Sequence, residues 1–160
     1  MILFHGSLQI VREPRILVPT RTLDYGSGFY TTTSEQQARE WVLRKLSNSD
    51  IGYINVYFFD EQKALALDRL SFDNPPGEDW VDFVHANRTQ RGFTHNHDLV
   101  YGPVANDRVY AAFALYEQGL LSKQELIAEL KTYKLIDQML FHTEKALQTL
   151  TFSQVKEVRV

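Results

Sequence analysis

The sequence predicts a protein of the α+β class, with short strands and helices following one another along a single domain. Its length of 160 residues fits one domain. Hydrophobic residues make up 44% of the chain and charged residues 23%, proportions that allow a sizeable core. Apolar runs of strand length alternate with segments of helical periodicity. We therefore expect one domain over residues 1–160, with about six or seven strands.

The first half of the chain is rich in residues that favour strands, interrupted by one helical segment. Thr33 or Ser34 can cap a helix that runs to about Leu46. Helical spacing predicts that this helix turns Ala38, Trp41, Val42 and Leu46 to the core. The expected strands are residues 2–5, 16–18 (closed by Pro19), 29–32, 53–59 and 64–68, with a turn at 24–28.

The second half begins at a Pro-Pro-Gly loop within residues 71–77 and contains most of the predicted helices. Ser122 with Glu125 forms a capping box that starts one of them. We expect helices at 78–87, 106–118, from 122 onward and at 143–150, a polar loop at 88–97, and strands at 98–104, 138–142 and 152–158.

Composition and charge exclude several classes of function. The chain has no cysteine, which rules out disulfides, a thiolate zinc site and a cysteine nucleophile. A net charge of -3 argues against a broadly basic nucleic-acid clamp. No apolar run approaches the roughly 20 residues of a membrane helix. No basic leader precedes the first apolar run, so we expect a cytoplasmic protein without a membrane partner.

The first candidate for chemistry is His5-Gly6-Ser7, at the end of the first predicted strand. A glycine after the histidine lets a ligand approach the backbone closely. A histidine that simply ends a strand before a turn would give the same pattern.

The second candidate combines Gly26 and Gly28 with the aromatic residues Tyr30 and Trp41, eleven positions apart. A strand end followed by a helix can bring two aromatic rings to opposite sides of one slot. Such a slot suits a flat cationic ring, through stacking and cation–π attraction. Aromatic residues are 12% of the chain, more than a core of this size needs, although both rings also suit the core.

The third candidate is Gln138, a polar residue at the start of the strand Gln-Met-Leu-Phe. Together, Phe4-His5-Gly6-Ser7, the Gly28, Tyr30 and Trp41 group, and Gln138 resemble the ADP-ribosyltransferase superfamily. The resemblance is to the clade with a His, Tyr and Glu, Asp or Gln signature, which includes diphtheria-toxin-like toxins and poly(ADP-ribose) polymerases. It spans positions 4 to 141, and a Gly-Pro-Val-Ala-Asn-Asp stretch at 102–107 resembles a small bacterial family of this clade.

This resemblance implies a split β-sheet with surrounding helices that binds NAD as a co-substrate. It implies that His5 holds the adenosine-side ribose, that the Gly6 backbone holds the nicotinamide amide, and that Ser7 contacts the nicotinamide or its ribose. Tyr30 and Trp41 would enclose the nicotinamide ring, with Gly28 in the turn before them. Gln138 would bond to the 2′-hydroxyl of the nicotinamide ribose. His5, Tyr30 and Gln138 are then the expected catalytic residues.

Two departures from the pattern bear on the activity. Trp41 stands where better-known members carry Tyr, and it stacks equally well. Gln138 stands where they usually carry Glu, and an amide cannot act as a general base. This argues for a single transfer rather than polymer elongation. Glu144 lies six residues later, on a short predicted helix, where an acid also suits the helix N-terminus.

We therefore expect an NAD-dependent mono-ADP-ribosyltransferase, by analogy an intracellular bacterial toxin or defence effector with a cognate antitoxin. Its acceptor, protein or nucleic acid, stays open. A degenerate NAD-binding module and an NAD glycohydrolase are the alternatives. No metal is expected, because His95 and His97 lack a firm third ligand. Arg88, Arg91 and Asp107 could meet a ligand, but solvent exposure or helix capping explains each.

Overall fold

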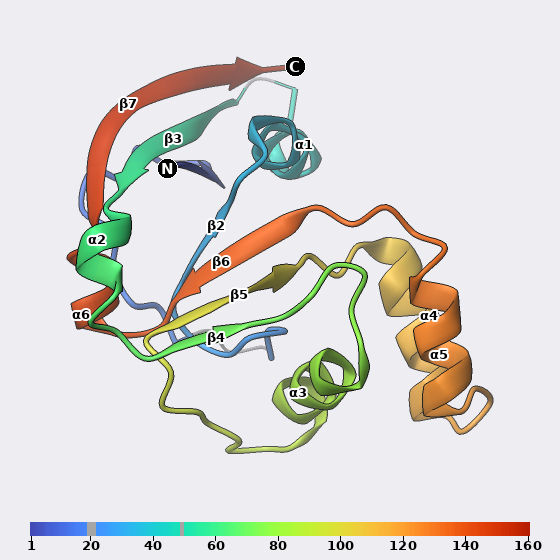
Figure 1. The fold of residues 1–160 in the computed structure, drawn as a ribbon. Helices are drawn as coiled ribbons and strands as arrows, with labels where there is room; N and C mark the ends of the chain where they lie inside the picture. Colours follow the sequence, from blue (N-terminus) through green and yellow to red (C-terminus); the bar gives the residue numbers. More distant parts are fainter. Residues whose placement is uncertain (19–21, 49) are drawn as a thin grey trace.

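The computed structural model describes residues 1–18, 22–48 and 50–160. In these residues the chain forms one mixed sheet with helices inserted between its strands (Figure 1). The strands are β1 (Ile2–Ser7), β2 (Phe29–Thr32), β3 (Ile51–Phe59), β4 (Arg69–Ser71), β5 (Leu99–Pro103), β6 (Asp137–Phe141) and β7 (Leu150–Arg159). The helices are α1 (Glu35–Lys45), α2 (Glu61–Ala64), α3 (Glu78–Thr89), α4 (Asp107–Glu117), α5 (Lys123–Leu130) and α6 (Glu144–Leu147).

The seven-stranded sheet has the order β4-β5-β6-β2-β1-β3-β7 and consists of two well-paired halves. In the first half-sheet, β7, β3 and β1 pair antiparallel over long registers. In the second half-sheet, β2, β6 and β5 pair antiparallel and β4 pairs parallel to β5. Between the halves, β1 and β2 share a single residue pair, Phe4 with Thr32. The strands therefore separate on either side of that pair.

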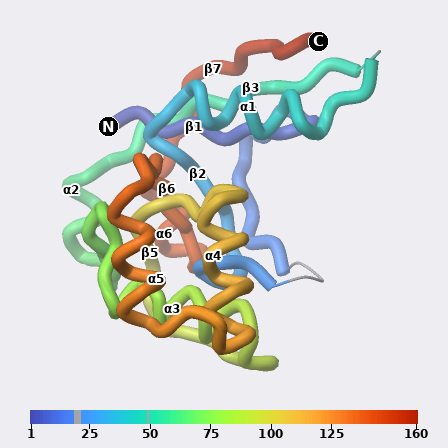
Figure 2. The backbone as a smooth tube through the Cα atoms, turned by 90° about the vertical axis from the view of Figure 1, so that its right-hand side faces the viewer, coloured from blue at the N-terminus to red at the C-terminus, as the bar shows by residue number. Residues whose placement is uncertain are grey.

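The helices cover the sheet in groups that follow its two halves. Helix α1 packs on the first half-sheet through Ala38 and Val42, which meet Ile54 and Val56 of β3. Helices α3, α4 and α5 gather around the second half-sheet, where Trp80 and Phe113 are fully buried (Figures 1 and 2). A third cluster lies near the short helices α2 and α6 and includes Leu3. In the described ranges, no helix has both the length and the apolar character needed to cross a membrane.

Most predicted elements are present with shifts of one to three residues at their ends. Ser34, not Thr33, caps α1, and its side chain accepts a hydrogen bond from the Gln37 backbone N–H. Ser122 and Glu125 form the expected capping box. The helix predicted for residues 143–150 is shorter, because β7 already begins at Leu150.

Two predicted strands are wrong. Residues 16–18 form no regular structure, and Pro19 lies outside the described residues. Ala64 is the last residue of the short helix α2, residues 65–67 form a turn, and the strand comes later, at Arg69–Ser71. The Asp60 side chain caps α2 by accepting hydrogen bonds from the Gln62 and Lys63 backbones. A local side-chain cap thus outweighs the apolar alternation of the following residues.

The packing predicts a large difference between two leucines near α5. Leu130 is fully buried, whereas Leu120 is 67% exposed. Leu130→Ala should lower the free energy of unfolding by about 2–5 kcal/mol, because it leaves a cavity. Leu120→Ala should change it by less than about 0.5 kcal/mol. Urea denaturation of the two variants measures both values, and equal losses would contradict this packing of α5.

Candidate functional site

The three sequence motifs meet at the junction of the two half-sheets. Phe4 of β1 pairs with Thr32 of β2, and Thr32 pairs with Gln138 of β6. Gln138 in turn pairs with Gly102 of β5. We call these four residues the junction row. Because neighbouring strands lie about 4.8 Å apart, residues more than a hundred positions apart in sequence lie within about 15 Å of one another.

His5 connects the two half-sheets directly. Its Nδ1 lies 2.7 Å from the Tyr30 carbonyl oxygen, and its ring packs on Phe29 with the centroids 4.2 Å apart. A carbonyl oxygen only accepts hydrogen bonds, so Nδ1 carries the proton and Nε2 is an acceptor. Burial lowers the pKa of His5 below its ordinary value, which favours this neutral form.

Gly6 lies against α1. A Cβ atom at this position would be 2.5 Å from the Ala38 carbonyl oxygen and 2.9 Å from a methyl group of Val42. Any side chain here would push α1 away from β1. Ser7 follows at the end of β1, half-buried, and its hydroxyl accepts a hydrogen bond from the Gln9 backbone at 3.1 Å.

Tyr30 is fixed by the glycine turn before it. Its hydroxyl donates to the Gly26 carbonyl at 2.6 Å and accepts from the Tyr25 backbone N–H at 3.1 Å. Burial raises the pKa of Tyr30 above its ordinary value, so the hydroxyl keeps its proton. Gly28 has a φ of 142° and is buried against the Phe141 carbonyl oxygen, which a Cβ atom would overlap.

The structure does not bring the two aromatic residues of the second motif into ring contact. In the described part of the chain, the only ring interaction of Trp41 is with the Lys45 ammonium, 5.7 Å from its centroid. The expectation that Trp41 turns to the core is wrong, since it is 36% exposed. Ala38 and Val42 fill the buried face of α1, and Trp41 lies beside it. Tyr30 instead packs against the cluster of α3, α4 and α5.

Gln138 is half-buried in β6, and its Nε2 donates to the Pro103 carbonyl oxygen at 3.4 Å. Near it lies Tyr25, whose sequence context indicates only a turn. The Tyr25 hydroxyl is fully buried and donates to the same carbonyl at 2.8 Å. Trp80 of α3 donates to that hydroxyl at 2.9 Å. A tyrosine inside a glycine turn is the one sequence signal that marks this residue.

A second missed group consists of histidines behind the glycine turn. His142 follows β6, with Nδ1 2.6 Å from the Ser27 carbonyl and Nε2 3.1 Å from the His95 carbonyl. The His95 and His142 rings lie 4.0 Å apart, and His95 Nε2 lies 2.8 Å from the Tyr25 carbonyl. These contacts hold residues 24–28 against the loop after α3.

Other residues considered from the sequence have structural roles or face solvent. Arg88 lies over the Tyr110 ring at 4.6 Å and pairs with Glu117 at 3.3 Å. Arg91, Asp107 and Glu144 are exposed. His97 pairs with Asp68 at 2.8 Å, and the described residues contain no group of three ligands arranged for a metal ion.

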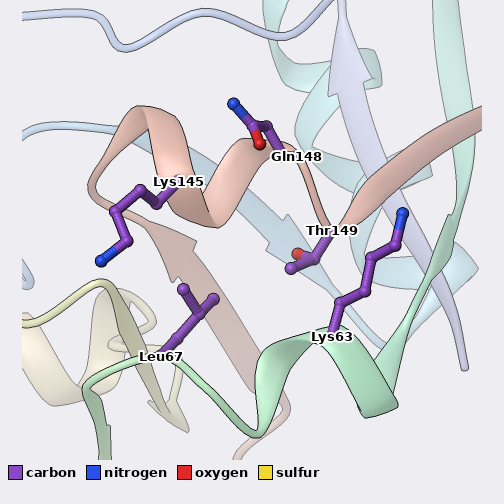
Figure 3. Close-up of a pocket in the computed structure, with 5 residues that line it drawn as sticks. All are labelled: Lys63, Leu67, Lys145, Gln148 and Thr149. Carbon is purple, nitrogen blue, oxygen red and sulfur yellow. The ribbon is translucent and has the colours of Figure 1, made fainter.

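A hollow of about 260 Å³ lies apart from the junction row, between α2 and α6 (Figure 3). Lys63, Leu67, Lys145, Gln148 and Thr149 line it. Figure 3 shows the two lysine side chains extending in different directions, so they do not converge on one point.

Fold and site together define an α+β protein whose polar motifs meet where two half-sheets join. The chain matches the family described as protein of unknown function (DUF3990) over residues 1–152 and belongs to that family. Neither the curated proteins nor the solved structures contain a match to it.

The geometry of Gly28 predicts an unusually costly glycine replacement. Gly28→Ala should lower the free energy of unfolding by about 2–4 kcal/mol, because it adds a steric overlap to an unfavourable φ. Gly92 also has a positive φ, 79°, but nothing lies within 4 Å of its Cβ position. Gly92→Ala should therefore cost only about 1 kcal/mol. Similar losses in denaturant titrations would contradict the close approach at Gly28.

Burial of His5 predicts how stability changes in mild acid. Its folded-state pKa lies below the ordinary value of 6.5, so the unfolded chain takes up a proton first as the pH falls. Above about pH 6.5, His5 is neutral in both states and does not change the free energy of unfolding. Below that pH, protonation of His5 in the unfolded chain lowers the free energy of unfolding. His5→Gln should flatten this decline between pH 7 and pH 5 in urea titrations. A decline parallel to that of the wild type would show that His5 is not buried.

Proposed function

We propose that this protein is an NAD-dependent mono-ADP-ribosyltransferase with an ADP-ribosyltransferase-like split sheet. The observation that carries the proposal is that the His, Tyr and Gln motifs lie on three adjacent strands, at and beside the junction row. The order of these strands, β1, β2 and β6, brings together residues whose types suit one ligand. If the three motifs matched the superfamily pattern by chance, nothing would require them to lie on adjacent strands.

The backbone at Gly6 supports binding of a planar amide such as that of nicotinamide. Successive residues of a strand direct their N–H and C=O groups to opposite edges. The His5 carbonyl accepts from the Asn55 side chain of β3 at 3.4 Å, so the polar groups of Gly6 face the β2 side. On that side, among the residues that the structure describes, β1 pairs with a strand only at Phe4. Gly6 can therefore offer one donor and one acceptor to a ligand.

The side chains around the junction row fit the remaining parts of NAD. His5 Nε2 can accept from a hydroxyl of the adenosine-side ribose, because Nδ1 is already bound to Tyr30. Ser7 extends the same strand toward the nicotinamide ribose. The exposed ring of Trp41 offers a stacking face, and the fixed ring of Tyr30 offers a second surface. Gln138 can accept from the 2′-hydroxyl of the nicotinamide ribose.

In the proposed reaction, the glycosidic bond to nicotinamide breaks and nicotinamide keeps the electron pair. The acceptor then attacks the cationic ribose carbon and loses a proton. The protein contributes position and polar stabilisation, since Gln138 cannot take that proton. This limitation favours a single transfer. The acceptor, protein or nucleic acid, carries a positive charge once the new bond has formed, and water can then take its proton.

The setting of this activity follows by analogy with small bacterial members of the superfamily. We propose a toxin or defence effector that acts in the cytoplasm and is held inactive by a cognate antitoxin. The alternatives are distinguished by products. Free ADP-ribose without labelled macromolecules would identify an NAD glycohydrolase. NAD binding without any product would identify a degenerate binding module.

Nicotinamide release from NAD by the purified chain tests the proposal. Wild-type protein should release nicotinamide and label a lysate fraction with biotinylated NAD. His5→Ala, Tyr30→Ala and Gln138→Ala should each reduce release by at least about tenfold. Glu144→Ala, an exposed carboxylate near the same strand, should retain activity. Release that survives all three site variants, or no release and no label from the wild type, would refute the proposal.

A further inference from the structure

The side chain of Gln138 belongs to a buried hydrogen-bond network that fixes which way its amide points. The Pro103 carbonyl oxygen can only accept, so the nitrogen of the Gln138 amide must face it. The Tyr25 hydroxyl donates to the same Pro103 carbonyl at 2.8 Å, so the hydroxyl and the amide nitrogen share one acceptor. The amide nitrogen is therefore turned toward Pro103, which leaves the carbonyl oxygen of Gln138 turned away from it.

Trp80 and Gly102 hold the Tyr25 hydroxyl in this place. The Trp80 indole N–H donates to the hydroxyl at 2.9 Å from the buried face of α3. A Cβ atom at Gly102 would lie 2.6 Å from the hydroxyl oxygen, so only glycine leaves room for it. Gly102 is also the register partner of Gln138, which places the hydroxyl directly beside that residue.

We propose that Tyr25 is a positioning residue that turns the Gln138 carbonyl oxygen, Oε1, toward the substrate ribose, in a site built for an amide rather than a carboxylate. This inference rests on the proposed function. Within the described ranges no donor of the protein is paired with Oε1, so that atom is the one presented to a ligand. Gln138 is then the residue this site requires, not a weakened form of glutamate.

A carboxylate at position 138 would meet groups that repel it. The Pro103 carbonyl has no proton to give, and the single proton of Tyr25 is already used. Burial raises the pKa of Tyr25, which keeps that hydroxyl neutral. The Asp137 carboxyl group on the same strand is a neighbour of like kind, and it accepts a hydrogen bond from the Tyr101 hydroxyl of β5 at 2.6 Å. The ionisable groups that β2 and the preceding turn contribute are Tyr30 and Asp24. The charge of Asp24 helps to raise the pKa of both Tyr25 and Tyr30.

The first experiment needs no ligand. In Gln138→Glu the folded-state pKa of the new carboxyl should lie above its unfolded value. The folded state then binds more protons, and stability decreases as the pH rises between the two values. The melting temperature of Gln138→Glu, relative to wild type, should therefore fall from pH 5 to pH 8. Gln154→Glu, an exposed position on β7, serves as control and should show no such trend. A difference that is constant with pH overturns the proposal.

The second experiment follows nicotinamide release with the same variant. At pH 8, Gln138→Glu should be at least about tenfold less active than wild type. Its activity should recover as the pH falls, because a protonated carboxyl can donate to Pro103 as the amide does. Higher activity than wild type at neutral pH overturns the proposal. Such a gain would mean that the glutamate restores a catalytic carboxylate that the wild-type site lacks.

The third experiment asks whether Tyr25 acts through Gln138. Tyr25→Phe keeps the buried ring and should lower kcat by about tenfold while KM for NAD changes by less than about threefold. In the Gln138→Ala background, Tyr25→Phe should have little further effect. Losses that multiply instead assign Tyr25 a merely structural role and overturn the proposal. Tyr57→Phe removes the hydroxyl of an equally buried tyrosine from the cluster near α2 and α6 and gives the stability cost alone.

These readouts separate failure of the inference from failure of the proposed function. If wild-type protein neither binds nor cleaves NAD, the proposed function fails, whatever the melting curves show. If wild-type protein cleaves NAD but Gln138→Glu lacks the pH trend in melting, the function stands and the matched amide site is wrong.

Discussion

The hydrogen bond from His5 to the Tyr30 carbonyl is the contact on which the rest of this architecture depends. In the described part of the chain only Phe4 and Thr32 pair as strands between the two half-sheets, so the backbone alone joins the halves weakly. The His5 ring satisfies a carbonyl that strand separation would leave without a partner. It also packs on Phe29, which buries the junction on one side. The residue proposed to orient NAD is therefore also a structural link between the halves, and its tautomer follows from that link.

Much of the fold could be predicted from local patterns, because their causes are local. The β3 segment is an apolar run interrupted by a single polar side chain, Asn55, and the capping box at Ser122 and Glu125 depends on residues three positions apart. The order of the three site motifs was also readable from the sequence. Strand pairing places Gln138 of β6 beside Thr32 of β2, and β2 is the neighbour of β1, which carries His5. Sequence alone contained the candidates but not this register, which arises from the packing of distant segments.

Other features could not be predicted because tertiary contacts decide them. Trp41 has the helical spacing of a core residue, yet the narrow contact of α1 with β1 admits only Ala38 and Val42. Tyr25 looks like an ordinary turn residue, and its partner Trp80 lies 55 positions away. No local pattern links the two. Their meeting depends on how α3 docks beneath β5 and β6, and so does the environment of Gln138.

The junction between the two half-sheets also has a mechanical consequence. Each half has its own helices, whereas the cluster near α2 and α6 contains residues of both halves, such as Leu3 of β1 and Phe141 of β6. A rigid molecule that gripped Gly6 on one side and Gln138 on the other would act as a brace across the junction. Binding of such a molecule would then reduce the motion of one half-sheet relative to the other. A partner protein that separated the two half-sheets would inactivate the molecule without contacting the reacting atoms.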